Sequence, residues 1–178
     1  MFPISHFNQV KTPFYYYDKT LLNHTLSTLT RLAEDRNFVV HYAIKANANP
    51  GILKIIAAAG VGADCVSGGE IKAALAAGFP AKKIVFAGVG KADWEIEYAL
   101  ENKIFCFNVE SAEELAVIEE LARKKETIAS VALRLNPNID AHTHEYITTG
   151  LNENKFGIPL EMLDGVLAQM QNYTHVQL

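Results

Sequence analysis

The segment FVVHYAIKANANP, residues 38–50, holds the first strand signal and the first helix signal of a pattern that repeats along the chain. Its first nine residues are rich in β-branched and aromatic side chains, which favour a strand. Asn49 then supplies an N-cap and Pro50 a first helical residue, so a helix is predicted to begin there and to end near Gly60. A strand followed directly by a helix is the repeating unit of parallel sheets.

The same unit recurs down the chain, with a repeat of about 20–25 residues. The further strands are predicted in GVGADCV, KIVFAG, IFCFNV, IASVALRLNP and the terminal THVQL. Two of the helices between them begin with capping boxes, Ser67 with Glu70 and Ser111 with Glu114. In the last helix, PLEMLDGVLAQM, one apolar stripe is predicted, made of Leu160, Leu163, Leu167 and Met170. This repeat indicates an α/β fold, either an open doubly wound sheet or a (β/α)8 barrel.

The two faces of the predicted strands favour the barrel. In the first strand the bulky face carries Phe38, Val40, Tyr42 and Ile44, and the other face carries Val39, His41, Ala43 and Lys45. In the fifth strand the bulky face carries Val131, Leu133 and Leu135, and the other face carries Ser130, Ala132, Arg134 and Asn136. A face of small residues that ends in a charge suits a barrel interior with a site at the carboxyl ends of its strands.

Five or six strands are fewer than the eight of a closed barrel. We therefore expect residues 19–178 to be the amino-terminal part of a TIM barrel. Residues 1–18 contain the aromatic segment TPFYYYD, predicted to be a lone strand, with Asp18 capping the helix that follows. We expect that strand to pair with a β domain that this chain does not contain. An unfinished barrel has open strand edges, so we also expect the 178-residue chain alone to associate and to be inactive.

Composition and charge exclude several classes of function. The chain is 49% hydrophobic and 20% charged, its net charge is -4 and its pI is about 5.9, which argues against nucleic acid as a partner. No apolar run is long enough to span a bilayer, and the start MFPISHFNQVKTPF does not resemble a signal peptide. Cys65 and Cys106 indicate neither a disulfide framework nor a zinc site. We expect a cytoplasmic protein without a membrane partner.

Three charged residues stand at predicted strand ends. Lys45 lies at the end of the first strand, Asp64 at the end of the second and Arg134 at the end of the fifth, so a barrel would bring them to one mouth. A lysine buried there would lose proton affinity, and its neutral amine could bond covalently to an aldehyde. From position alone, Lys45 could equally be a lysine whose stem packs while its amine reaches water, and Asp64 and Arg134 a surface ion pair.

Three motifs resemble those of one enzyme family. HYAIKANANP (residues 41–50) resembles the cofactor-lysine segment of the alanine-racemase-like, or fold-type III, pyridoxal-phosphate enzymes. GADCVSGGEI (residues 62–71) resembles the next segment in the decarboxylase branch. RLNPNIDAHTHEYITTGLNENKFGI (residues 134–158) is similar to the loop of the diaminopimelate decarboxylases. The resemblance runs from about residue 12 to residue 178, in the order and spacing of the family.

The resemblance implies a cofactor, a reaction and roles for individual residues. Lys45 would carry pyridoxal 5'-phosphate and later help to return a proton to the product. Arg134 would lie against the cofactor ring, and Asp64 would orient Arg134 or Lys45. The reaction implied is decarboxylation of meso-2,6-diaminopimelate to L-lysine, in a homodimer that binds a small amino-acid substrate. The family's phosphate loop, ring-nitrogen partner and ring-stacking histidine would lie beyond residue 178.

Several alternatives stay open. The enzyme could instead act on ornithine, arginine or carboxynorspermidine, or the chain could be a non-catalytic cofactor-binding or partner-binding relative. Ser67 and Glu70 match the family motif, but helix capping explains both, and Cys65 is expected to pack in the core. A polar cluster could be a metal site, made of Asp140, His142, His144 and Glu145. A substrate-gating loop over residues 138–157 explains the same segment more simply.

Overall fold

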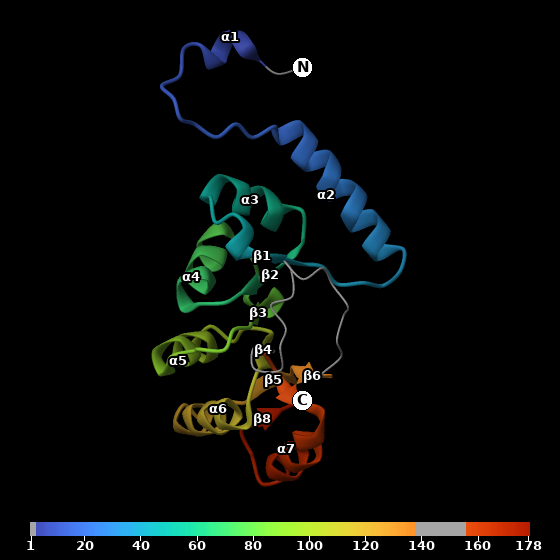
Figure 1. Ribbon diagram of the computed structural model, residues 1–178, viewed down its shortest axis with the longest axis vertical. Helices are drawn as coiled ribbons and strands as arrows, with labels where there is room; N and C mark the ends of the chain where they lie inside the picture. Colours follow the sequence, from blue (N-terminus) through green and yellow to red (C-terminus); the bar gives the residue numbers. More distant parts are fainter. Residues whose placement is uncertain (1–2, 138–155) are drawn as a thin grey trace, which may run out of the picture.

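Six parallel strands run in chain order in the computed structural model, which describes residues 3–137 and 156–178. Figure 1 shows four helices, α3 to α6, along one side of these strands. The strands of this sheet are β1 (His41–Ala43), β2 (Gly62–Cys65), β3 (Ile84–Phe86), β4 (Cys106–Val109), β5 (Ala129–Leu133) and β8 (Val176–Gln177). Their order, β1-β2-β3-β4-β5-β8, has no reversal of direction, so it is the order of a barrel and not of a doubly wound sheet.

The helices begin and end where local signals place them. They are α1 (Ile4–Phe7), α2 (Lys19–Glu34), α3 (Pro50–Ala58), α4 (Gly68–Ala77), α5 (Asp93–Glu101), α6 (Ala112–Lys124) and α7 (Leu163–Met170). Three short 3-10 turns are η1 (Ile44–Ala46), η2 (Ala81–Lys83) and η3 (Leu160–Met162). The predicted N-caps of α2 and α3 are confirmed, since Asp18 Oδ1 and Asn49 Oδ1 each accept two backbone N–H groups. Gly78 ends α4 in the left-handed conformation, at a φ of 96°.

The hydrophobic core lies between the sheet and α3 to α6. The strand side chains that point into it are fully or almost fully buried: Ala63, Cys65, Ile84, Phe86, Phe107, Val109 and Val131. Alternate residues point to the other face, where Asp64, Val85 and Asn108 are half-buried and Ala132 is exposed. The predicted division into a bulky face and a face of small residues is therefore confirmed.

Two strand predictions were too long. The first strand was predicted over residues 38–46 but is paired only over His41–Ala43, and Lys45 lies in the 3-10 turn η1 that follows. Asn47 causes the turn, because its N–H bonds to the Ile44 carbonyl and its side chain accepts from the Asn49 N–H. The fifth strand breaks at Arg134. Beyond it, β6 (Leu135–Asn136) pairs with β7 (Ile158–Pro159) in a separate two-stranded sheet.

The apolar stripe predicted in α7 is confirmed only in part. Leu163 is half-buried and Met170 packs against the core, but Leu160 and Leu167 are 47% and 37% exposed, and the buried residue of this helix is Val166. Leu160 lies in the 3-10 turn η3, whose three residues per turn put it out of line with the stripe of the α-helix that follows. The predicted sixth strand is confirmed as β8, which pairs with β5.

A glutamate on α6 holds the start of β8. Glu119 accepts hydrogen bonds from the backbone N–H groups of Thr174 and His175, at 3.1 and 2.8 Å. Burial alone would raise the pKa of the Glu119 carboxyl, but these bonds and the His175 side chain outweigh burial and lower that pKa. The carboxylate is thus fixed in its charged form, and it aligns β8 with β5.

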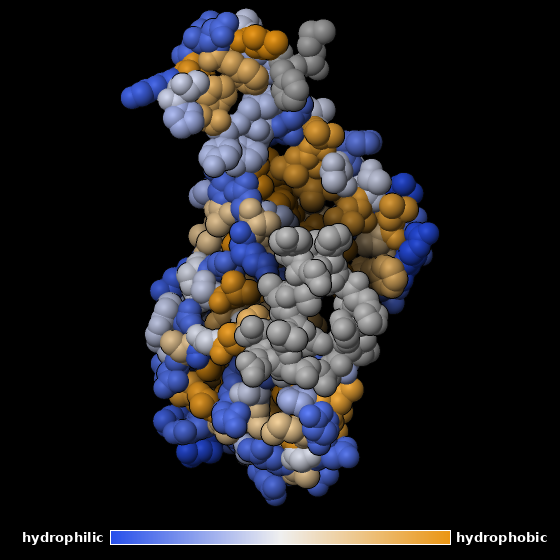
Figure 2. Space-filling model, viewed as in Figure 1, coloured by the Kyte–Doolittle hydropathy of each residue, from blue (hydrophilic) through white to orange (hydrophobic). Residues whose placement is uncertain are grey.

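Residues 12–18 form no strand among the described residues. They are exposed and run from α1 to α2, away from the sheet, as Figure 1 shows. A strand needs a hydrogen-bonded neighbour, so the expected pairing with a β domain stays a prediction. Figure 2 shows apolar residues along α2, where Leu21, Leu29 and Leu32 are exposed.

Two glycines test the packing of the sheet. A Cβ on Gly62 would lie 2.5 Å from the His41 ring and 2.6 Å from the Lys83 carbonyl oxygen, whereas a Cβ on Gly165 in α7 would meet nothing within 4 Å. We expect Gly62→Ala to lower the free energy of unfolding by about 1–3 kcal/mol, because the backbone contact cannot move away easily. The control, Gly165→Ala, should raise it by roughly 0.5–1 kcal/mol. Urea unfolding measures both; equal stability of the two variants would contradict the strand contacts.

Candidate active site

A cavity of about 850 Å³ opens on the small-residue face of the sheet, and the three predicted residues Lys45, Asp64 and Arg134 all line it. They come from the turn after β1, from β2 and from the end of β5. The polar part of the wall also includes His41 of β1, Asn108 of β4 and Glu110, the residue after β4. Parallel strands bring their carboxyl ends to one edge, which is why residues far apart in sequence meet here.

Lys45 is carried by a firmly held turn. The residue before it, Ile44, is fully buried, and the Tyr42 hydroxyl donates to the Asn47 carbonyl oxygen at 3.3 Å. Burial raises the pKa of the Tyr42 hydroxyl, so it stays a hydrogen-bond donor. The Lys45 side chain itself is exposed among the described residues. Its backbone is therefore fixed while its amine is accessible from the cavity.

Arg134 is held by a carboxylate and an aromatic ring. Its Nη1 donates to Glu110 Oε1 at 2.8 Å and to Oε2 at 3.1 Å, and its guanidinium lies 5.6 Å from the centre of the Phe156 ring. Glu110 is only 6% exposed. A carboxylate in that position must be paired, and Arg134 provides the pairing.

Asp64 lies in the cavity, as predicted, without a hydrogen bond to either of the other two predicted residues. It lies in register with Ala43 of β1 and Val85 of β3, and it lines the cavity beside Lys45. Within the described residues no hydrogen bond joins Asp64 to Lys45 or to Arg134; the partner of Arg134 is Glu110. The Asp64 carboxylate acts on His41 instead. Burial lowers the pKa of His41, and the negative charge of Asp64 partly opposes this shift.

Glu110 was missed by reasoning from the sequence, although a signal for it exists. It directly follows β4, at the same strand end as the lysine and the arginine that were singled out. Its neighbour Ser111 begins a capping box, and this local pattern explains Ser111 and Glu114 without pointing to the Glu110 carboxylate.

The structural interpretations of the neighbouring motif are confirmed. Ser67 Oγ accepts from the Glu70 N–H at 3.2 Å, and Glu70 Oε2 accepts from the Val66 N–H at 2.8 Å, so both cap α4. Cys65 is fully buried, and burial, with smaller effects of Glu70 and Asp64, raises the pKa of its thiol to about 12. A thiol of that kind is a packing residue and not a nucleophile.

Two further predictions lie outside the described residues. These are the metal cluster of Asp140, His142, His144 and Glu145, and most of the gating loop over residues 138–157. In the described ranges, no group of three or more His, Cys, Asp or Glu side chains could hold a metal ion.

Comparison with known proteins identifies the family of this chain. The sequence profile described as "Pyridoxal-dependent decarboxylase, pyridoxal binding domain" matches residues 21–178. The diaminopimelate decarboxylase of Bacteroides thetaiotaomicron is 61% identical over 94% of this chain and 44% of its own length. The crystal structure of a Helicobacter pylori diaminopimelate decarboxylase mutant with L-lysine superposes with a TM-score of 0.88, at 42% identity, over 97% of this chain and 44% of that one.

A second solved structure gives the same fold. Diaminopimelate decarboxylase from M. jannaschii with L-lysine superposes with a TM-score of 0.85, at 37% identity, over 98% of this chain and 42% of that one. The chain thus spans less than half the length of these relatives. The predicted fold class, a pyridoxal-binding α/β barrel that is not closed by the strands of this chain, is confirmed. Pyridoxal phosphate is the cofactor that these matches imply, and the chain belongs to the pyridoxal-dependent decarboxylases, whose pyridoxal-binding domain residues 21–178 match.

Proposed function

We propose that the full-length protein decarboxylates meso-2,6-diaminopimelate to L-lysine, with pyridoxal 5'-phosphate held by Lys45. The observation that carries the proposal is the meeting of Lys45, Asp64 and Arg134 in one cavity at the strand ends. Support comes from the 61% identity to a diaminopimelate decarboxylase and from the fold shared with structures that contain L-lysine, the expected product.

The residues of the cavity fit the cofactor. Its volume of about 850 Å³ lies within the range of cofactor sites, and it offers an accessible amine, a carboxylate and a planar cation. When bound, pyridoxal phosphate supplies a ring that accepts the electron pair left by the departing carboxyl group. Lys45 would bind the cofactor aldehyde and later deliver a proton to the carbon that has lost carbon dioxide. Arg134, held in place by Glu110 and Phe156, would lie with its planar guanidinium against the ring.

Asp64 would act through charge and not through a direct hydrogen bond. It lines the same wall as Lys45, so its negative charge would stabilise a cationic group in the cavity. The exposed position of Lys45 implies that the desolvation expected from the sequence must come from atoms other than the described residues, the cofactor and substrate among them.

The substrate is tested by comparing rates of carbon dioxide release. We expect kcat/KM of the full-length protein for meso-diaminopimelate to exceed that for ornithine or arginine by on the order of 10⁴-fold. A site built to bind the distal amino-carboxylate group of diaminopimelate leaves polar groups unpaired with ornithine or arginine, whose distal end is a cation without a carboxylate. Equal or faster release from ornithine or arginine would replace the proposed substrate. Cofactor binding without release from any of the three would favour the non-catalytic relative.

We also propose that the enzyme is a homodimer of the cytoplasm. The resemblance to fold-type III decarboxylases supports the dimer, and sedimentation of the holoenzyme at the mass of one chain would contradict it. In the part of the chain that the structure describes, no helix has the length and apolar character needed to cross a membrane.

A further inference from the structure

Lys91 is a buried lysine outside the cavity. It lies between β3 and α5, its side chain is 1% exposed, and its Nζ lies 5.3 Å from the centre of the Phe86 ring. Its ammonium donates to the Gly88 carbonyl oxygen at 2.7 Å, to the Asn108 carbonyl oxygen at 2.9 Å and to Glu114 Oε1. A lysine ammonium has three protons, so every donor is used.

Such burial calls for an explanation beyond stability. Removing an ammonium from water is costly, and apolar residues of similar volume often stabilise a protein as well as a buried ion pair does. What an apolar side chain could not do is join three separate segments at fixed positions. Lys91 joins the loop after β3, through Gly88, to the end of β4, through Asn108, and to the first turn of α6, through Glu114.

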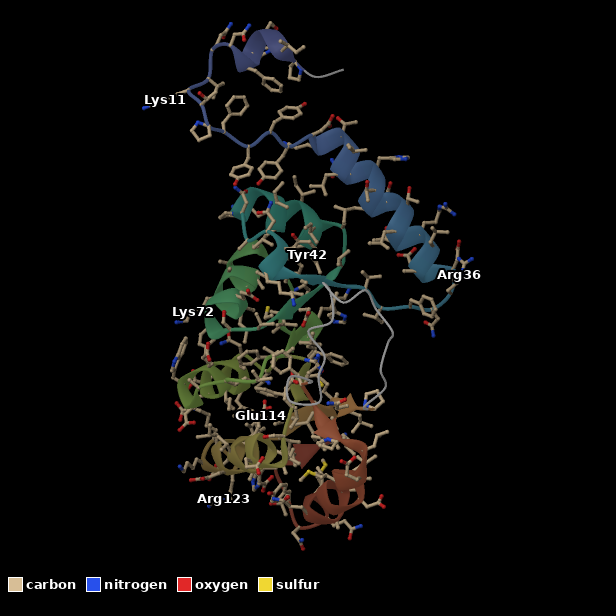
Figure 3. The ribbon with its side chains drawn as sticks, viewed as in Figure 1. Lys11, Arg36, Tyr42, Lys72, Glu114 and Arg123 are labelled. Atoms are coloured by element: carbon tan, nitrogen blue, oxygen red, sulfur yellow. The ribbon has the colours of Figure 1, made fainter. Side chains whose placement is uncertain are left out.

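Glu114 continues the connection toward the cavity. Figure 3 labels this residue at the end of α6 that faces the strands. Its Oε1 accepts a hydrogen bond from the Lys91 ammonium, and its Oε2 accepts one from the backbone N–H of Glu110 at 2.8 Å. The carboxylate of Glu110 in turn holds Arg134. A continuous chain of hydrogen bonds therefore runs from Lys91 through Glu114 and Glu110 to Arg134, and Lys91 and Glu114 do not line the cavity.

We propose that Lys91 and Glu114 are positioning residues that set the place of Glu110, and through it the place of the Arg134 guanidinium against the cofactor. The proposal rests on the proposed function, in which Arg134 lies against the cofactor ring. Without Lys91, Glu114 would lose the charge that fixes it, the Glu110 backbone would lose a fixed acceptor, and the guanidinium would be free to shift. Polar partners one step behind a site commonly matter in this way.

The test uses Lys91→Met in the full-length protein, with the exposed Lys82→Met as a matched control. We expect Lys91→Met to weaken binding of pyridoxal 5'-phosphate to the apoprotein, followed by absorbance, by about 10–100-fold. We also expect a similar loss in kcat for diaminopimelate. Lys82→Met should leave both unchanged. If Lys91→Met fails to fold by circular dichroism, Glu114→Gln is used instead. It keeps the size of the side chain, removes its charge and replaces one of its two acceptor oxygens by an NH2 group, and it should show the same losses more weakly.

A double-mutant cycle separates positioning from a general loss of structure. In an Arg134→Met background, Lys91→Met should change the cofactor dissociation constant by less than about twofold, because the residue through which it acts is already gone. If Lys91→Met weakened cofactor binding by the same factor in the Arg134→Met background as in the wild-type protein, the proposal would be overturned. If even the wild-type protein bound no cofactor at Lys45, the proposed function would fail, and the positioning role would then be decided by a crystal structure of Lys91→Met. Loss of the Arg134–Glu110 hydrogen bonds in that structure would support the positioning role, and unchanged hydrogen bonds would overturn it.

Discussion

Replacement of Lys45 by alanine is expected to lower decarboxylation of diaminopimelate by at least about 1,000-fold, because the covalent route through the lysine amine is closed. Among the described residues, Lys45 is the lysine that lines the cavity, so none of the other described lysines is placed to replace it. The fold should be unaffected, since the side chain is exposed and the turn is held by Ile44 and Asn47.

Two measurements sharpen this expectation. Lys54→Ala removes an exposed lysine from α3, close in sequence to the turn, and should keep the wild-type rate. A small primary amine added to Lys45→Ala should restore part of the activity, because it can enter the space left by the side chain and supply the missing nitrogen. Wild-type turnover by Lys45→Ala without added amine would show that this lysine does not take part in the reaction.

Replacement of Arg134 by lysine is expected to cost almost as much as replacement by alanine, on the order of 100-fold in kcat. The guanidinium bonds to both oxygens of Glu110 and lies 5.6 Å from the centre of the Phe156 ring, and an ammonium keeps the charge but not the planar surface. Arg123→Lys, at an exposed position of α6 that Figure 3 labels, is the matched control and should have no effect. A near-normal rate in Arg134→Lys would show that charge alone suffices at this position.

Local chemistry made much of the fold predictable. The caps formed by Asp18, Asn49, Ser67 and Ser111 are hydrogen bonds to residues two or three positions away, so they can be identified from the sequence directly. The alternation of bulky and small residues along the strands likewise identified the face that carries the cavity.

The features that could not be predicted from the sequence depend on contacts between residues far apart in the chain. The end of β1 depends on a turn whose stability comes from the buried Ile44, and the break in β5 depends on β7, more than twenty residues further along the chain. The Arg134–Glu110 pair joins residues 24 positions apart, and Lys91 contacts Glu114 at a separation of 23. A lysine between two predicted elements is usually a solvated one, so nothing in the local sequence distinguishes Lys91.

Covalent capture of the cofactor tests the central claim most directly. The full-length protein, incubated with pyridoxal 5'-phosphate, is reduced with borohydride, digested, and its peptides are mapped by mass spectrometry. We expect the pyridoxyl group on Lys45, within the segment IKANANP, and none on the control residue Lys54. A pyridoxyl group on another lysine, with Lys45 unmodified, would contradict the account.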